Sequence, residues 1–186
     1  MISSRVLIRI FLIGLVVFGL AGCGSSGHHK VVGSPAQLRH LPPPANPTQA
    51  SAKFPLVAKP SQHLVEFYIQ AGENNGFDFN GDSNGKLKLD IPLGWTVEIF
   101  CHNSASSLYH SCAVVSGASA ISPVFPGASV PNPQEGINPG STQSFTFVAS
   151  QAGNFRLVCL VPGHEAAGMW GTVVVSSTIT DPELLS

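Results

Sequence analysis

Three residues near the C-terminus have side chains that together can bind a metal ion: Cys159, His164 and Met169. They supply a thiolate, an imidazole and a thioether, and each lies five residues from the next, between two apolar segments. Soft thiolate and thioether ligands favour copper, and a trigonal set of two His and one Cys with a weak axial Met is the arrangement of blue-copper electron-transfer sites. Such a set needs a second His, for which His110 is the candidate.

The elements around these residues give the spacing a geometric reason. Cys159 ends one expected strand, the Pro162-Gly163 pair turns the chain, and Met169 opens the returning strand. One tight loop can therefore aim three ligands at one point, while His110 adds a ligand from a distant strand and ties the site to the scaffold.

His102 is the competing His, because it lies close to His110 in the sequence. It sits at a strand end before Asn103, so we expect a solvated loop residue there. In the strand that begins at His110, alternate residues share a face, which groups His110 with Cys112. We expect Asn103 and Ser111 to orient the ligands through hydrogen bonds.

The folded part of the chain is predicted to be β throughout, with short apolar or alternating runs separated by turns rich in Gly and Pro. Seven or eight such strands without a convincing helix predict an all-β Greek-key sandwich. Residues 116–141, rich in Gly, Pro, Ser and Asn, are predicted to be an irregular surface excursion. The expected strands are residues 64–69, 85–91, 95–101, 110–115, 144–148, 155–159 and 170–175.

Composition and charge exclude several classes of protein. Charged residues make up only 10% of the 186-residue chain, and hydrophobic residues make up 44%, so the chain is not a disordered polar one. All ten acidic residues lie from Glu66 onward, where the only basic residues are Lys86, Lys88 and Arg156. An acidic folded part argues against nucleic acid as a partner and allows steering towards a basic protein.

The first 23 residues are predicted to be a lipoprotein signal peptide. Arg5 and Arg9 flank the start of an apolar run that is shorter than the roughly 20 residues of a membrane span. The ending Leu20-Ala21-Gly22-Cys23 resembles a bacterial lipobox, in which the Cys is lipidated. Ordinary cleavage or an uncleaved anchor is the alternative. Each of these outcomes places the rest of the chain outside the cytoplasm, on the outer face of the cell membrane or in the periplasm.

The remaining sequence divides into three parts. Residues 24–60 contain seven prolines and are predicted to be a tether with polyproline character. Residues 61–176 form the expected domain, and residues 177–186 a loose C-terminal tail.

The cysteines suggest one disulfide. Four Cys in an exported protein ordinarily indicate two bonds, but lipidation of Cys23 and a metal-binding Cys159 leave Cys101 and Cys112 available to each other. Both are expected to face the sandwich interior. Facing sheets lie about 10 Å apart, whereas a disulfide needs Cα atoms within about 7 Å. This spacing argues against a disulfide between Cys101 and Cys112. We expect the bond because the compartment is oxidising.

The chain resembles the cupredoxins, and within them sulfocyanin, with rusticyanin as the nearest cousin. The resemblance is carried by Phe79-Asn-Gly-Asp-Ser-Asn-Gly85, Pro92-Leu-Gly-Trp95, the His110 region and Val158-Cys-Leu-Val-Pro-Gly-His-Glu-Ala-Ala-Gly-Met-Trp170. It implies one copper ion that cycles between Cu(I) and Cu(II), with His110, Cys159 and His164 as equatorial ligands and Met169 as the axial ligand.

The resemblance also implies how the protein works. Relatives carry single electrons in the respiratory chains of acid-living microbes, so cytochromes or a terminal oxidase are the expected partners, in weak contacts with a monomer. In relatives the ring edge of the C-terminal His emerges through an apolar patch. Here that patch is expected around His164, from Leu160, Pro162, Ala166, Ala167 and Trp170.

Two other functions compete with an electron carrier. The first is an extracytoplasmic copper-delivery lipoprotein, but the chain has only two Met, one of them Met1, whereas delivery sites are rich in Met and His. The second is an enzyme. Copper oxidases need further His clusters such as His-x-His, and no Ser/His/Asp arrangement or phosphate-binding Gly-rich loop is present, so we expect no enzymatic activity.

Overall fold

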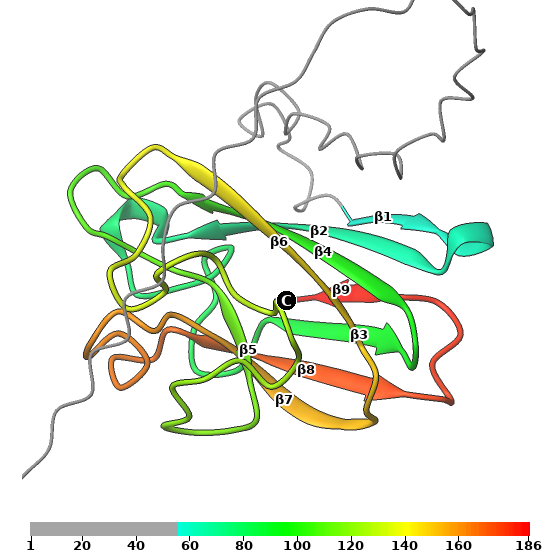
Figure 1. Cartoon of the computed structure of the whole chain (residues 1–186). Helices are drawn as coiled ribbons and strands as arrows, with labels where there is room; N and C mark the ends of the chain where they lie inside the picture. Colours follow the sequence, from blue (N-terminus) through cyan, green and yellow to red (C-terminus); the bar gives the residue numbers. More distant parts are fainter. Residues whose placement is uncertain (1–55) are drawn as a thin grey trace, which may run out of the picture. The chain divides into compact units, whose positions relative to one another are not determined.

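The computed structural model describes residues 56–186, which form two packed β-sheets (Figure 1). The first sheet has the order β1-β2-β4-β6 and the second the order β5-β7-β8-β3-β9. The prediction of an all-β sandwich is confirmed. The strands are β1 (Leu56–Lys59), β2 (Leu64–Ala71), β3 (Lys88–Pro92), β4 (Thr96–Asn103), β5 (Ala113–Val115), β6 (Thr142–Val148), β7 (Gly153–Val158), β8 (Trp170–Ser176) and β9 (Glu183–Leu185).

Alternation of apolar and polar residues explains why these segments are strands with one buried face. In β2, every second residue from Val65 to Ala71 is fully buried or nearly so, and the residues between them are only partly covered. β2 pairs in parallel with β4, and β4 pairs antiparallel with β6. Aromatic rings from both sheets fill the interior, and Phe125 stacks on Phe147 with ring centroids 5.2 Å apart.

Two 3-10 turns interrupt the strands: η2 (Pro60–Gln62) and η3 (Glu73–Asn75). No helix within residues 56–186 is long and apolar enough to cross a membrane. The predicted signal peptide, the lipidation site Cys23 and residues 24–55 of the predicted tether lie outside the described residues.

Both predicted ends of the domain need correction. β1 begins at Leu56, inside the segment assigned to the tether, and pairs antiparallel with β2. The tail was predicted to be loose, but β9 pairs with β3 from Asp90↔Glu183 to Lys88↔Leu185. These strands have four and three residues, too few for an alternation pattern, and the neighbouring strand supplies their hydrogen bonds.

The prediction of a surface excursion for residues 116–141 is only partly right, because the segment is irregular but contributes side chains to the core. Residues 116–141 contain no strand, but Phe125, Ala128, Val130 and Ile137 are buried in the core. Isolated bridges join Ser129 to Ala113 and Ile137 to His110. The Gly, Pro, Ser and Asn residues of this segment predict turns, and its apolar residues are too widely spaced to form a periodic pattern. The sequence therefore did not indicate that these apolar side chains enter the core.

The hairpin between β7 and β8 carries the sequence motif. The two strands pair from Gly153↔Val175 to Val158↔Trp170, so residues 159–169 form the loop that joins them. At its base the amide of Cys159 donates a hydrogen bond of 3.2 Å to the carbonyl of Met169. Two of the candidate ligands therefore face each other where the loop closes.

Candidate metal centre

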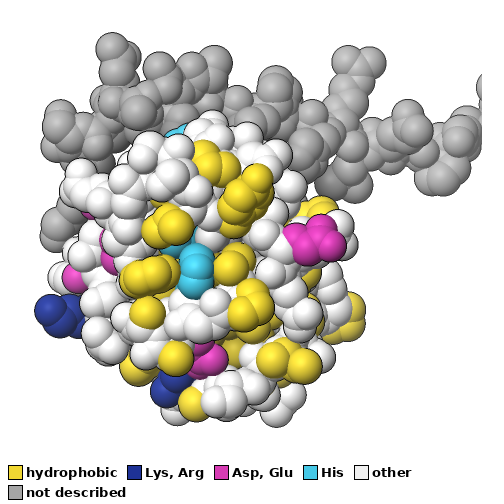
Figure 2. Space-filling view, turned by 90° about the vertical axis from the view of Figure 1, so that its left-hand side faces the viewer, with side chains coloured by type: hydrophobic (Ala, Val, Ile, Leu, Met, Phe, Trp, Pro, Cys, Tyr) yellow, Lys and Arg dark blue, Asp and Glu magenta, His cyan; other side chains and the backbone are white. Residues whose placement is uncertain are grey.

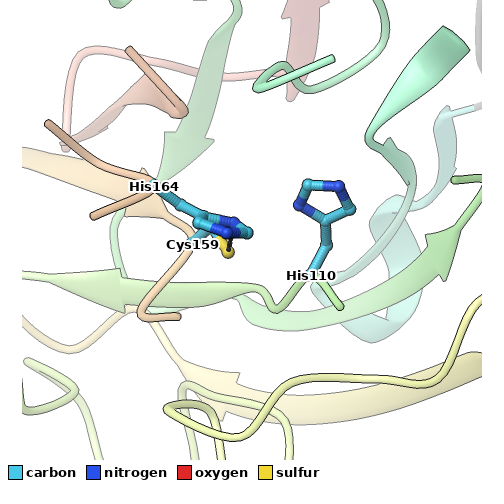
Figure 3. A group of neighbouring side chains, drawn as sticks. All are labelled: His110, Cys159 and His164. Carbon is cyan, nitrogen blue, oxygen red and sulfur yellow. Dashed lines mark hydrogen bonds between the residues drawn. The ribbon is translucent and has the colours of Figure 1, made fainter. Parts of the chain in front are cut away.

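The four candidate ligands lie together at one end of the sandwich. One donor atom from each of His110, Cys159 and His164 lies within 4.8 Å of the others, and Figure 3 shows His110 facing the other two across a small gap. The Cys159 sulfur is 3.3 Å from Nδ1 of His164. The sulfur of Met169 is 3.1 Å from Nδ1 of His110. The spacings of 3.3 and 3.1 Å match ligands that share one ion, since metal bonds of about 2.0–2.3 Å separate ligand atoms by roughly 3–4 Å.

Three of these side chains are shielded from water. His110, Met169 and Cys159 are buried, and His164 is only partly covered. Among the described residues, Cys159 is the only cysteine outside a disulfide. The site is therefore a dry, soft donor set with one edge, the His164 imidazole, reaching towards solvent.

Burial shifts the proton equilibria of all three titratable ligands. Burial lowers the pKa of His110 to about 4, and a smaller contribution comes from the neighbouring His164. Burial also lowers the pKa of His164 and raises the pKa of the Cys159 thiol. Neutral imidazoles are ready to bind a metal, whereas the thiol gives up its proton when a metal replaces it.

Hydrogen bonds from Ser111 hold the sulfur. Its amide donates to the Cys159 sulfur at 3.2 Å, and its hydroxyl lies 3.6 Å from the same atom. The hydroxyl also accepts a bond of 2.9 Å from the amide of Leu160. These bonds favour the thiolate and oppose the rise in its pKa.

Asn103 secures the loop that leads to His110. Its side-chain amide donates to the carbonyls of Leu108 and Ile137, each at 2.8 Å, and its carbonyl oxygen accepts the amide of Ala105 at 3.0 Å. Both residues expected to support the ligands, Asn103 and Ser111, are thus buried and bonded around the site.

The prediction for His102 is wrong. It lies within β4, not in a solvated loop, and its Nδ1 is 2.9 Å from the hydroxyl of Thr142 on β6. Adjacent strand residues point to opposite faces, so His102 is directed away from the core that Cys101 enters. It takes no part in the cluster.

A disulfide joins Cys101 of β4 to Cys112, which precedes β5, and the two Cα atoms are 6.1 Å apart. The bond therefore links the two sheets two residues after His110. The Cα separation is below the spacing of about 10 Å expected between facing sheets, and Cys112 lies just before β5 begins, outside the strands of that sheet.

Two residues that the sequence did not single out contact the candidate ligands. The Phe77 ring meets the His164 ring edge-on with centroids 4.8 Å apart, and it lies 6.3 Å from the His110 ring. Gly72 lies so close to His110 that an added Cβ would be 2.4 Å from Nε2. Both lie more than 30 residues before the nearest candidate ligand, so no local motif connects them to the site.

The expected apolar patch around His164 is partly formed. Pro162, Ala166 and Ala167 are exposed, Trp170 is half-buried and Leu160 is almost covered. Exposed Phe77 and Tyr109 add apolar surface at the same end of the molecule. Figure 2 shows this end, with a His side chain surrounded mainly by hydrophobic and uncharged groups.

Comparisons with known proteins give the family. A family model described as "Sulfocyanin (SoxE) domain" matches residues 50–185. A sulfocyanin from Sulfolobus acidocaldarius is 31% identical in an alignment of 133 residues. The match covers 64% of this chain and 66% of that protein, just under two thirds of its length.

Among solved structures, a reduced rusticyanin is 25% identical and covers 67% of this chain and 90% of its own, with a TM-score of 0.45. Auracyanin A from Chloroflexus aurantiacus is 22% identical and covers 61% and 99%, also with a TM-score of 0.45. The chain belongs to the sulfocyanin family of cupredoxins, which bind one copper ion.

Proposed function

We propose that this protein is a single-copper electron carrier in which His110, Cys159 and His164 are the equatorial ligands and Met169 is the axial ligand. The observation that supports this most directly is the buried Cys159 sulfur, 3.3 Å from an imidazole nitrogen and held by the Ser111 amide. A donor set of one thiolate, two imidazoles and one thioether would suit copper better than Zn²⁺, Mg²⁺ or Ca²⁺. When bound, copper supplies a one-electron change between Cu(I) and Cu(II).

The protein residues keep the site in one geometry. Nδ1 of His110 faces Met169, whereas its Nε2 is buried against Gly72 and has no hydrogen-bond partner among the described residues. The ring is thus wedged in place and offers Nδ1 to the metal. A site that cannot relax between oxidation states reorganises little, which favours fast electron transfer.

The exposed edge of His164 is the proposed route for the electron. Phe77 covers part of the ring and limits water access, while the surrounding apolar surface allows close contact with a partner. A small and weak interface suits a transient redox encounter. The partners we propose are respiratory redox proteins, cytochromes or a terminal oxidase, met by a monomer that is not itself an enzyme.

We also propose that the carrier works outside the cytoplasm, tethered to a membrane by lipid on Cys23. Support comes from the lipobox-like sequence and from the disulfide, which suits an oxidising compartment. Mass spectrometry of the protein from membranes tests the anchor. A lipid mass on Cys23 is expected, and a Cys23→Ser chain released from membranes supports it; an unmodified Cys23 on a membrane-bound chain contradicts it.

A visible spectrum tests the copper carrier. The full-length chain, loaded with Cu(II), should show an intense thiolate-to-copper band near about 600 nm that bleaches on reduction. The band should disappear in Cys159→Ser. The matched control is the double variant Cys101→Ser with Cys112→Ser, which removes two sulfurs but leaves the ligand set and should keep the band. A colourless protein that binds copper stoichiometrically would instead favour copper delivery.

A further inference from the structure

Arg156 contacts both sides of the β7–β8 loop that carries three candidate ligands. Its Nη1 donates to a carboxylate oxygen of Glu165 at 3.0 Å, and Glu165 directly follows His164. Its guanidinium carbon lies 3.8 Å from the centre of the Trp170 ring, and Trp170 directly follows Met169. One side chain on β7 therefore connects the neighbours of two ligands.

Glu165 is held from a second direction. The amide of Ser119 donates to both of its carboxylate oxygens, at 3.2 and 3.4 Å. The side chains of Arg156 and Glu165 are only 27% and 19% exposed, so their interaction is partly protected from water. An ion pair with this burial and with additional hydrogen bonds is stronger than a free surface pair.

Trp170 provides a firm base for the other contact. Its ring lies against Gly85, where an added Cβ would be 2.3 Å from a ring carbon, and its carbonyl accepts the Gly85 amide at 2.9 Å. As the first residue of β8, it is also paired with Val158. The guanidinium stacks on a ring that the sheet already fixes.

The loop transmits these restraints to the ligands. The amide of Gly168 donates to the carbonyl of Glu165 at 2.9 Å, and the amide of Met169 donates to the carbonyl of His164 at 3.0 Å. A displacement of Glu165 must therefore disturb the turn that sets the separation of His164 and Met169.

We propose that Arg156 is a positioning residue of the copper centre, which holds the ligand loop closed by stacking on Trp170 and pairing with Glu165. The proposal rests on the proposed ligand set. The planar guanidinium is required, because it can stack and donate in fixed directions at once, which a Lys ammonium cannot.

Amide hydrogen exchange of the metal-free full-length chain tests this positioning role of Arg156 without copper. Arg156→Met should speed exchange of the Gly168 and Met169 amides by about tenfold, because it removes both the cation–π contact and the part-buried ion pair. Glu165→Gln, which removes the ion pair alone, should speed exchange of the same amides by a smaller factor. The two variants combined should exchange no faster than Arg156→Met alone, since Arg156→Met already removes the ion pair that Glu165→Gln breaks. Arg156→Lys should recover only part of the protection.

Lys59→Met is the matched control, because it removes a different part-buried ion pair, with Glu66, on the other sheet. It should leave the loop amides unchanged. The proposal is overturned if Arg156→Met leaves these amides at the wild-type rate. It is equally overturned if exchange rises uniformly, including β2 and β4, because the residue is then only a general stabiliser.

The copper-loaded chain gives a second readout. Charge alone predicts opposite shifts of the reduction potential, since Arg156→Met removes a positive charge and Glu165→Gln a negative one. If Arg156 and Glu165 position the loop together, both variants should change the copper-thiolate band and the electron paramagnetic resonance spectrum in the same direction. Unchanged spectra would overturn the proposal. Absence of the band in the unmutated chain would instead refute the proposed copper carrier and leave the exchange result intact.

Discussion

The amide of Ser111 donates a hydrogen bond of 3.2 Å to the sulfur of Cys159, across 48 residues of sequence. Ser111 follows His110 directly, so the segment that supplies one candidate ligand also sets the electronic environment of another. The Ser111 hydroxyl in turn ties the sulfur to the amide of Leu160. The two halves of the site are thus fixed to each other before any metal binds.

Ser111→Ala should lower the reduction potential of the copper-loaded protein. Without the hydroxyl, the thiolate has more negative charge to donate, which stabilises Cu(II). One hydrogen bond of roughly 1 kcal/mol corresponds to a shift of about 40 mV for one electron. Voltammetry checks the shift, with Ser106→Ala, on the exposed loop, as the control. A potential equal to that of the unmutated protein would contradict a role for the hydroxyl.

Gly72→Ala should distort the His110 position. Gly72 has φ of +74°, and its new Cβ would lie 2.4 Å from the His110 ring. Gly94→Ala is the matched control, because Gly94 has φ of +85° but nothing within 4 Å of the added atom. Both variants pay about 1 kcal/mol for the backbone, and only Gly72→Ala should lose a further 1–3 kcal/mol or so and bind copper more weakly. Chemical unfolding and copper titration distinguish the two variants. Equal losses of stability and copper affinity would contradict close packing of Gly72 against His110.

Phe77→Ala should open the centre to water while keeping all four ligands. Phe77 is 39% exposed and packs edge-on against His164. Water that reaches the site stabilises the more highly charged Cu(II), so we expect a lower reduction potential and retained copper. Ile121→Ala removes an even more exposed side chain, 67% accessible, and should change nothing. Loss of copper from the Phe77 variant would show a structural role instead of shielding.

The metal-free protein should lose stability as the pH falls from about 6.5 to 4. The pKa of His110 is about 4 when folded and near 6.5 when unfolded, so the unfolded chain takes up the proton first. The full stabilisation is therefore present above the unfolded pKa, and about 3 kcal/mol is lost by the time His110 is protonated in the folded state. Urea unfolding across this range measures it. His110→Asn should show a smaller slope, and an identical slope would contradict the assignment.

Removing the disulfide should destabilise the fold without removing the ligands. Cys101 and Cys112 are separated by 11 residues, and closing a loop of that length is worth roughly 3 kcal/mol. The double variant Cys101→Ala with Cys112→Ala should unfold at lower urea concentration by this amount. It should still bind copper, because the donor atoms come from other residues. Unchanged stability would mean that the bond does not form in the protein.

The sequence predicted the strand-rich fold and the three-ligand loop because both depend on local patterns. Alternation in β2 and β4 reports a buried face, and Cys159, His164 and Met169 lie in one hairpin whose turn is marked by Pro162-Gly163. It failed for β1 and β9, whose three or four residues are strands only because a neighbour pairs with them.

The sequence alone placed three candidate donors, Cys159, His164 and Met169, in one tight loop, because side-chain chemistry and short-range spacing can be read from neighbouring residues. Only the tertiary structure decided that His110 and Phe77 meet that loop and that Gly72 packs against His110. It also decided that Ser111 bonds the Cys159 sulfur and that Arg156 spans Glu165 and Trp170. These contacts join residues of different strands and loops, so they depend on sheet register and packing, which no local pattern encodes.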